Sequence, residues 1–306
     1  MLSPAPSPYK PTHVPDGRFA LPAWSVLRVE GPDAGAFLQA QTMNDVAALQ
    51  PGRWQWNGWL NPKGRLHALF ALLRMDESAF LLALPDMPAA ELGTALQRYV
   101  FRSKLRLEAG DAWQVHGEFA PAPGSSGADV ATATPEGGWI LDMGSATIGR
   151  RLHLSRATGT AIGETDAAVA PGADADAWME QDLRHGLPHL SAPQREAWTP
   201  QMLSLQRLRA YSLSKGCYPG QEIVARTHYL GHAKRSLRLL SGDGLVAGGD
   251  VVLADTGQAV GSIVCVHSHS RLALAVLGDF NHAAALQSAD HPVQQVALAD
   301  GLQRPL

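Results

Sequence analysis

Apolar and polar residues alternate along the first hundred residues in a way that predicts strands separated by helices. Residues 54–59 alternate indoles with polar or small side chains, which is the pattern of a half-buried strand. Gly31 and Pro32 end the strand before them, and Pro32 suits the first turn of a helix. The order of strand, helix, strands and helix predicts an α+β fold. The predicted strands are 24–29, 54–59, 66–73 and 79–84, and the predicted helices are 32–41 and 85–100.

The pattern changes after Leu237, where short Val, Leu and Ile runs alternate with turn residues. This spacing predicts a small all-β barrel or sandwich, with a boundary near Arg235. Upstream we expect a helix over 174–184 and a loop over 121–138, which is rich in Gly, Pro, Ser and Ala. Five prolines near the N-terminus predict a poorly ordered tail. The predicted regions are a tail (1–18), a main α+β region (19–235) and a C-terminal β-barrel (236–306).

The composition limits what this chain of 306 residues can be. Apolar residues make up 45% and charged residues 17%, enough to bury a core, and the net charge of −3 excludes a uniformly basic nucleic-acid coat. The longest apolar runs, such as 79–84 and 272–277, hold six residues each, whereas a membrane-spanning helix needs about 20. No signal peptide opens the chain, so we expect a cytoplasmic protein without membrane contact. No large amphipathic surface is evident, and we expect a monomer.

Two cysteines, Cys217 and Cys265, are too few for a disulfide framework or for a four-thiolate metal site built by one chain. Cys265 lies in an uninterrupted apolar segment, where core packing is the expected role. Two histidine pairs have suggestive spacing, the first without an obvious third ligand and the second on one strand face beside a turn, and we take all four histidines as non-metal. They are His228, His232, His267 and His269. We therefore expect that this chain alone holds no metal.

The segment KGCYPGQE (215–222) carries the most information about function. Two glycines and a proline within six residues require a tight turn rather than a helix. A thiol on such a turn can face a cavity, and nearby positive charge favours its thiolate. Residues 204–238 carry a net charge of +6, which indicates an anionic ligand. Two other interpretations stay open: Cys217 as a small buried hydrophobe, and the cations as a solvated face.

A second basic run, 98–106, holds four cations and two aromatic side chains. Such a run can contact a polyanion, but we favour a helix end whose cations match the helix dipole. Most of the eight tryptophans are expected in the core. Because an indole is also a good platform for a heteroaromatic ligand, Trp24 and Trp178, which lie near turns, are candidate ligand walls.

Together these segments resemble the YgfZ-type folate-binding proteins, which are relatives of the glycine-cleavage aminomethyltransferase (T-protein). The resemblance runs from about Trp24 to the end, and residues 215–222 fit the family motif K-G-C-Y-x-G-Q-E at every fixed position. Four weaker segments occur in the family's order. They are FLQAQTMNDV (37–46), NPKGR (61–65), YVFRSK (99–104) and PQML (200–203).

The resemblance implies two interwoven α+β subdomains and a C-terminal barrel around a central folate pocket. It maps the two folate-contacting tryptophans onto Trp24 and Trp178, and the functional thiol onto Cys217. The implied cofactor is tetrahydrofolate or a one-carbon derivative. The implied role is the upkeep of iron–sulfur enzymes, including those that modify tRNA, with folate and iron–sulfur client or assembly proteins as partners. Direct tRNA binding does not follow and is not expected.

The motif residues are then expected to position Cys217 beside the folate and to stabilise its thiolate. Lys215 supplies positive charge, and Arg226 lies in the basic segment that favours the anionic folate tail. The others are expected to form or hold the turn, with Glu222 also pairing Arg226. They are Gly216, Tyr218, Gly220, Gln221 and Glu222.

Two departures from the T-protein bear on function. The strand GRLHAL (64–69) holds no carboxylate where the aminomethyltransferase has an acidic pair. Arg184 stands where that enzyme has a pteridine-binding glutamate, and a guanidinium cannot accept hydrogen bonds. Either folate lies differently, Glu180 or Asp182 substitutes, or folate binds weakly. A folate-dependent aminomethyl transferase is therefore the alternative function, disfavoured by the missing carboxylates.

Overall fold

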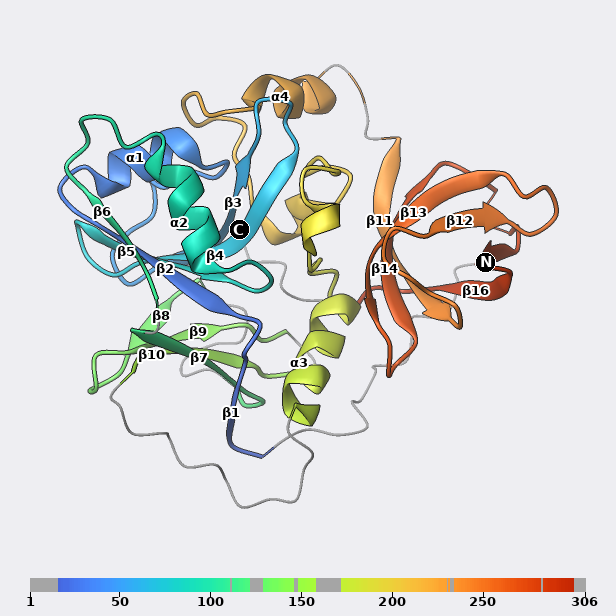
Figure 1. The fold of residues 1–306 in the computed structure, drawn as a ribbon, viewed down its shortest axis with the longest axis horizontal. Helices are drawn as coiled ribbons and strands as arrows, with labels where there is room; N and C mark the ends of the chain where they lie inside the picture. The colour runs from blue at the N-terminus through green and yellow to red at the C-terminus, as the bar shows by residue number, and fades with distance from the viewer. Residues whose placement is uncertain are drawn as a thin grey trace.

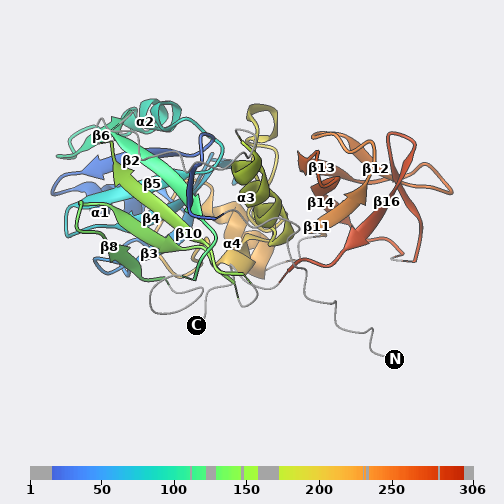
Figure 2. The same ribbon diagram turned by 90° about the horizontal axis from the view of Figure 1, so that it is seen from below.

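The computed structural model of the protein describes residues 16–110, 112–121, 129–145, 148–157, 172–229, 231, 234–281 and 283–299. Figure 1 shows two sheets on one side of the molecule and a barrel on the other, with helix α3 (Ala173–Arg184) between them. The view from below in Figure 2 shows the same order of sheets, helix and barrel. Among the described residues, no helix combines the length and the apolar character needed to cross a membrane.

The first sheet is five-stranded, and helices α1 (Ala34–Gln41) and α2 (Ala89–Gln97) pack on one of its faces. In spatial order its strands are β3 (Trp54–Leu60), β4 (Leu66–Arg74), β5 (Ala79–Leu84), β2 (Ser25–Glu30) and β6 (Arg106–Ala109). The predicted strands and helices of this region all form. Helix α2 is shorter than predicted because Pro88 is its N-cap, so the helix begins only after that proline.

Strand β5 shows why this sheet is central to the core. Phe80, Leu82 and Leu84 pack under the two helices, whereas Leu81 and Ala83 pack on the opposite face. Successive side chains of a strand point to opposite faces, so a continuous apolar run requires cover on both. Each large side chain buried in this way contributes about 1.5–3 kcal/mol. The same double cover makes β3 more buried than the half-buried strand that its alternation predicts.

The second five-stranded sheet is woven together with the first. Its spatial order is β1 (Arg18–Ala20), β7 (Trp113–Glu118), β10 (Arg151–Arg156), β9 (Trp139–Asp142) and β8 (Ala131–Ala133). Strand β1 precedes the strands of the first sheet in the chain, and the other four follow them. One apolar cluster, which includes Trp24, Trp54 and Trp178, joins both sheets to α3 and to the barrel.

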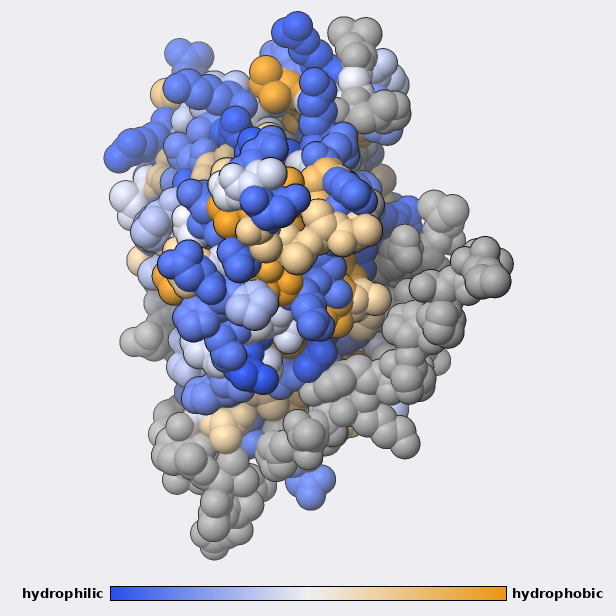
Figure 3. All heavy atoms as spheres, turned by 90° about the vertical axis from the view of Figure 1, so that its right-hand side faces the viewer, coloured by the Kyte–Doolittle hydropathy of each residue, from blue (hydrophilic) through white to orange (hydrophobic). Residues whose placement is uncertain are grey.

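The C-terminal strands close a barrel, so the molecule has the predicted α+β architecture with a C-terminal β-barrel. Around the barrel the order is β11 (Arg235–Gly242), β14 (Leu272–Gly278), β13 (Ala259–His267), β12 (Asp250–Leu253), β15 (Leu286–Ser288) and β16 (His291–Val296). Closure pairs every strand on both sides and so leaves no open sheet edge. Figure 3 views this end of the molecule and shows apolar residues gathered near the centre of a mostly polar face. The division into regions 19–235 and 236–306 stays a prediction.

Three local predictions were wrong. Strand β8 lies within the predicted loop 121–138, of which residues 122–128 are outside the described residues. The motif 215–222 is a turn followed by a helix, because Gln221 and Glu222 begin α4 (Gln221–Tyr229). Helix α2 ends at Gln97 rather than near residue 100, so Arg98, its C-cap, lies at the helix end and the other cations of the basic run lie beyond it.

Two short 3-10 helices, η1 (Ala192–Gln194) and η2 (Leu205–Leu208), lie in the connection that leads from α3 to the motif. At the other end of the chain, Arg18 belongs to β1 and pairs with Glu118, so the predicted tail ends before it. Residues 1–15 are outside the described residues.

Candidate functional site

The thiol of Cys217 is exposed in the turn that precedes α4. Gly220 fixes this turn with a left-handed φ of 79°. A Cβ on Gly220 would lie 2.6 Å from the carbonyl oxygen of Asn61 and 2.7 Å from Cα of Gly64. Only glycine permits this approach, which places the motif directly against the NPKGR turn. The exposure of Cys217 excludes the interpretation of this residue as a buried hydrophobe.

Lys215 has partners other than the expected thiolate. Its buried Nζ donates to the carbonyl oxygens of Gln39 (2.5 Å), Thr42 (2.5 Å) and Asn44 (3.0 Å). An ammonium group has three protons, and all three are engaged here. Burial lowers the pKa of Lys215 to about 8. Lys215 therefore fixes the motif on the segment that follows α1, and it can act on Cys217 only through its charge.

Tyr218 and Gln221 hold the turn as expected. The Tyr218 ring centroid lies 5.0 Å from Nζ of Lys215, and its hydroxyl donates to the carbonyl of Ser212 over 3.4 Å. Burial raises the pKa of Tyr218 to about 12, so the hydroxyl stays protonated. The Gln221 side-chain amide donates to the Lys215 carbonyl over 3.5 Å.

Two other motif expectations need correction. Glu222 and Arg226 are both exposed on α4, and the described residues show no ion pair between them. A Cβ on Gly216 would meet nothing within 4 Å, so Gly220 rather than Gly216 is the glycine that the turn requires. Arg226 remains a predicted contact for an anionic group, because its side chain points from an exposed helical position.

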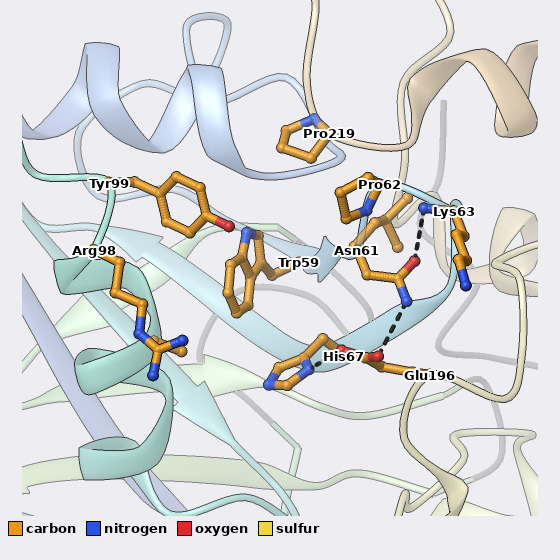
Figure 4. A pocket seen from close by; sticks show the side chains of 11 residues that line it. Trp59, Asn61, Pro62, Lys63, His67, Arg98, Tyr99, Glu196 and Pro219 are labelled. Atoms are coloured by element: carbon orange, nitrogen blue, oxygen red, sulfur yellow. Dashed lines mark hydrogen bonds and ion pairs between the residues drawn. The ribbon is translucent and has the colours of Figure 1, made fainter.

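A cavity of about 460 Å³ lies beside the motif turn, and Figure 4 shows its walls. Pro219 of the motif forms one wall, Pro62 and Lys63 of the NPKGR turn form another, and Arg98 and Tyr99 lie opposite. Three segments far apart in the sequence thus meet at one opening. The basic run that begins at Arg98 contributes to this cavity, a role that its position beyond the helix end allows.

The cavity contains a carboxylate although the strand that lines it has none. Glu196 Oε1 lies 2.8 Å from Nδ1 of His67, and the side-chain amide of Asn61 donates to Glu196 Oε2 over 3.1 Å. These two hydrogen bonds lower the pKa of Glu196. Its backbone has a φ of 60°, a conformation that non-glycine residues adopt mostly where the surrounding structure demands it. Sequence reasoning missed Glu196 because 129 positions separate it from His67 and no motif contains it.

Aromatic side chains and cations define what this cavity can bind. The Trp59 indole packs edge-to-face against Tyr99 and His67, and its buried Nε1 has no hydrogen-bond partner among the described residues. Arg98 and Lys63 are exposed at the rim. An unpaired indole N–H within an aromatic wall suits a flat ring that carries an acceptor, and the rim suits an attached anion. Trp59 was not among the tryptophans singled out from the sequence.

The two tryptophans predicted to contact folate do not line this cavity. Trp24 is 7% exposed and Trp178 is 1% exposed, and both belong to the cluster that joins the sheets to α3. Trp178 packs against Phe19 and Phe119, and the Arg150 guanidinium lies 4.6 Å over its ring. Both indoles are therefore packed into the core, away from this cavity.

Trp178 belongs to a group of five buried residues that we call the buried polar cluster. They are Arg150, Trp178, Asp182, His185 and His189. Arg150 Nη1 donates to Asp182 Oδ1 (2.7 Å), and His189 Nε2 lies 3.1 Å from Asp182 Oδ2. Within the described part of the chain, four buried nitrogens of the cluster lack hydrogen-bond partners. They are Nε and Nη2 of Arg150, Nε1 of Trp178 and Nε2 of His185.

The charges of the buried polar cluster are set by burial and by Arg150. Burial and then the Arg150 charge lower the pKa of His185 to about 4, so this imidazole is neutral. Its Nδ1 pairs with the Gln181 carbonyl over 2.7 Å, which leaves Nε2 as an acceptor. Burial by itself raises the pKa of Asp182, but Arg150 and His189 bring it below its usual value. The cluster thus presents unpaired donors and one unpaired acceptor.

The two carboxylates considered as substitutes for the T-protein glutamate are already engaged. Glu180 accepts hydrogen bonds from Arg184, with 2.8 Å between Oε1 and Nε. Asp182 is held by Arg150 and His189. Among the described residues of this region, Nε2 of His185 is a buried acceptor without a partner, and sequence reasoning missed it because only burial makes it a neutral acceptor.

Cys265 lies beside the buried polar cluster rather than beside the cavity. It is buried in β13, close to the backbone of His189. Burial raises the pKa of Cys265 to about 12. The expected core role is confirmed.

Comparisons with known proteins agree on the fold and the family. The crystal structure of the glycine cleavage system aminomethyltransferase T from Bartonella henselae aligns with a TM-score of 0.74 over 96% of this chain and 88% of that chain, at 16% identity. No protein-family model matches the sequence. The molecule therefore has the aminomethyltransferase fold.

Sequence relatives identify the family. The tRNA-modifying protein YgfZ of Vibrio vulnificus is 30% identical over 222 residues, which cover 71% of this chain and 67% of that protein. The YgfZ protein of Serratia proteamaculans is 28% identical over 78% of this chain and 75% of its own length. An uncharacterized protein of Haemophilus influenzae is 30% identical over 71% of each chain. The chain belongs to the YgfZ family, as its motifs indicate.

Proposed function

We propose that the protein binds tetrahydrofolate, or a one-carbon derivative of it, and supports the assembly or repair of iron–sulfur enzymes in the cytoplasm, including those that modify tRNA. Cys217 is the functional thiol in this proposal. Relatives named as tRNA-modifying proteins support a role in tRNA modification. The partners are iron–sulfur client or assembly proteins, and the protein acts as a monomer without direct tRNA contact.

The observation that carries the proposal is the exposed thiol of Cys217 on a turn that is anchored at both ends. Lys215 anchors one end of the turn through three carbonyls, and the contact of Gly220 with Gly64 anchors the other. A lone structural cysteine is usually buried, as Cys265 is. A rigid turn that presents a sulfur to solvent beside a cavity serves reaction or ligation, because packing gains nothing from it.

The buried polar cluster passes a chemical test for folate. A pterin carries ring nitrogens and a carbonyl that accept hydrogen bonds, together with an amino group that donates them. Arg150 and Trp178 present unpaired buried donors, and His185 presents an unpaired acceptor. Unpaired buried polar atoms are rare in folded proteins and each is costly, so a ligand that pairs them is favoured. In this proposal Trp24 and Trp178 contact the ring, and both are packed into the core before it binds.

Bound tetrahydrofolate supplies a carrier for a one-carbon unit. The residues of this chain bind and orient it: Arg150 and Trp178 by donating hydrogen bonds, and His185 by accepting one. Arg226, in the basic segment, attracts the anionic tail. Because Trp178 is 1% exposed and Arg150 lies over its ring, binding requires these side chains to move apart, and the bound ring would then be shielded from water.

The test is complementation of a bacterial strain that lacks its own family member. We expect Cys217→Ala to abolish recovery of iron–sulfur enzyme activity, including methylthiolation of tRNA, while Cys265→Ala, a matched removal of a thiol, restores it. Soluble expression of both variants is checked by immunoblot. Full recovery with Cys217→Ala would refute the role of the thiol.

One observation favours the alternative of a folate-dependent aminomethyl transferase. Residues 64–69 contain no carboxylate, but the fold brings Glu196 to this strand, where it pairs with His67. A transferase releases ammonia and formaldehyde equivalents from an aminomethyl donor only when tetrahydrofolate is present. Detection of that release, and its loss in Glu196→Gln, would establish the alternative, whereas no release at saturating tetrahydrofolate would remove it.

A further inference from the structure

Three potential metal ligands meet where α3 packs against the barrel. Asp176 lies in the first turns of α3, His267 ends strand β13, and His269 lies in the turn that follows. Their ligand atoms all lie within 4.8 Å of one another. The sequence predicts that His267 and His269 share one strand face beside a turn, and it predicts no metal there. The fold adds a third potential ligand from a helix more than ninety positions away.

Asp176 contacts both histidines of this triad, one through each carboxylate oxygen. Asp176 Oδ1 lies 3.0 Å from His267 Nε2, and Asp176 Oδ2 lies 3.0 Å from His269 Nδ1. His269 Nδ1 is hydrogen-bonded to Asp176 Oδ2, whereas His267 Nε2, which is almost fully buried, makes no hydrogen bond within the described residues although it faces Asp176 Oδ1. Ligands at about 2.0–2.1 Å from a tetrahedral zinc ion are about 3.3 Å apart, close to these separations.

The surroundings hold the buried imidazole in an orientation that suits a metal. The other ring nitrogen, His267 Nδ1, lies 2.6 Å from the hydroxyl of Ser270 and also accepts a hydrogen bond from the backbone N–H of Ser270 over 3.2 Å. These contacts fix the ring with Nε2 towards Asp176. Metal binding requires Nε2 to be free of its proton, with Nδ1 then donating to the Ser270 hydroxyl. His269 is 82% exposed, so the side of the triad away from the core is open to solvent. A fourth ligand can therefore be a water molecule.

We propose that Asp176, His267 and His269 bind one divalent transition-metal ion, with Zn²⁺ as the best match to a donor set of two imidazoles and one carboxylate. Calcium and magnesium are disfavoured because they prefer oxygen ligands. The ion joins α3 to β13 and so couples the barrel to the helix that carries Trp178. This inference is independent of the proposed function, and it opposes the expectation that the chain holds no metal.

The site is tested on untagged full-length protein after treatment with a chelator. We expect one equivalent of Co²⁺ to bind and to give the visible absorption of a four-coordinate site, and Zn²⁺ to displace it. Asp176→Asn and His267→Gln should each weaken Zn²⁺ binding by at least about 100-fold in a competition with a chromophoric chelator, since each removes a ligand. His228→Gln is the matched control, an exposed histidine on α4 outside the triad, and should bind as the wild type does.

A second measurement does not depend on the spectrum. Zn²⁺ should raise the melting temperature of the wild type and of His228→Gln but not of Asp176→Asn, because only a ligand of the folded state stabilises it. The melting temperature of each variant without metal reports whether it folds. Absence of a stoichiometric Co²⁺ signal, or equal Zn²⁺ affinity in wild type and Asp176→Asn, would overturn the proposal and leave the triad as ion pairs only.

Discussion

The buried polar cluster and the cavity beside Cys217 are two candidate ligand sites of opposite character. The cluster is closed to solvent and holds unpaired nitrogens on Arg150, Trp178 and His185. The cavity is open, and its carboxylate Glu196 is already paired with His67 and Asn61. Each region lies beside one of the two cysteines. A buried site with unpaired polar groups gains the most free energy when a ligand pairs them. An open site whose polar groups are already paired suits a partner that binds and dissociates reversibly.

The largest expected difference between the two regions is in thiol reactivity. A raised pKa of about 12 leaves Cys265 with about a thousandfold less thiolate than its ordinary pKa of 9.0 allows, and burial blocks access. We expect a maleimide reagent to label Cys217 at least about a thousandfold faster than Cys265 in the folded protein. Mass spectrometry of Cys217→Ala and Cys265→Ala assigns the two rates. Faster labelling of Cys265 would mean that the barrel opens readily and that the region beside Cys265 is not closed to solvent.

Substitution of Lys215 should mainly lower stability, whereas substitution of Cys217 in the same motif should leave stability unchanged and remove function. Lys215→Met leaves three carbonyls without their donor, and we expect a loss of about 3 kcal/mol in the free energy of unfolding. Cys217→Ala removes an exposed side chain and should change this free energy by less than about 0.5 kcal/mol. Urea unfolding curves measure both. Equal stability of Lys215→Met and the wild type would remove the anchoring role of the lysine.

The buried polar cluster should make the protein sensitive to mild acid. The pKa of His185 is about 4 in the folded protein and about 6.5 when unfolded, so the unfolded state binds more protons between these values. Stability should therefore fall as the pH drops from 6.5 towards 4, and His185 accounts for about 2 kcal/mol between pH 7 and pH 5.

The control for this pH effect is His185→Gln, which cannot titrate. Its unfolding free energy should fall by about 2 kcal/mol less than that of the wild type over the same interval. His153, whose pKa burial also lowers, contributes equally to both proteins and cancels. An identical fall in the two proteins would show that His185 is charged or accessible, and the closed site would then need revision.

The smallest expected effect, and the one that decides between the two regions for folate, is on affinity. We expect tetrahydrofolate to quench tryptophan fluorescence, with about tenfold weaker binding in Trp178→Phe, which keeps the apolar ring but removes the unpaired N–H. Trp24→Ala should also weaken binding. Trp59→Phe, the matched change in the open cavity, should not. The reverse pattern would place folate beside Cys217 and leave the buried polar cluster without a ligand.

Much of the architecture followed from local pattern. The continuous apolar run of β5 and the turn residues between the barrel strands predict elements that all form, because periodicity and turn chemistry are properties of neighbouring residues. The motif 215–222 predicted a turn, and its thiol is exposed. Where local pattern was insufficient, as at the indoles of β3, burial of both faces came from elements distant in the chain.

The sequence by itself determined the α+β class, the C-terminal barrel and the membership of Cys217 in a constrained turn. Only the tertiary structure brought Glu196 to His67, Asp176 to His267 and Gly64 to Gly220, and only burial turned His185 into a neutral acceptor. The physical reason is the range of the interactions concerned. Helix, strand and turn preferences act between residues a few positions apart, whereas the groups that make up a site meet across the core after those elements have packed.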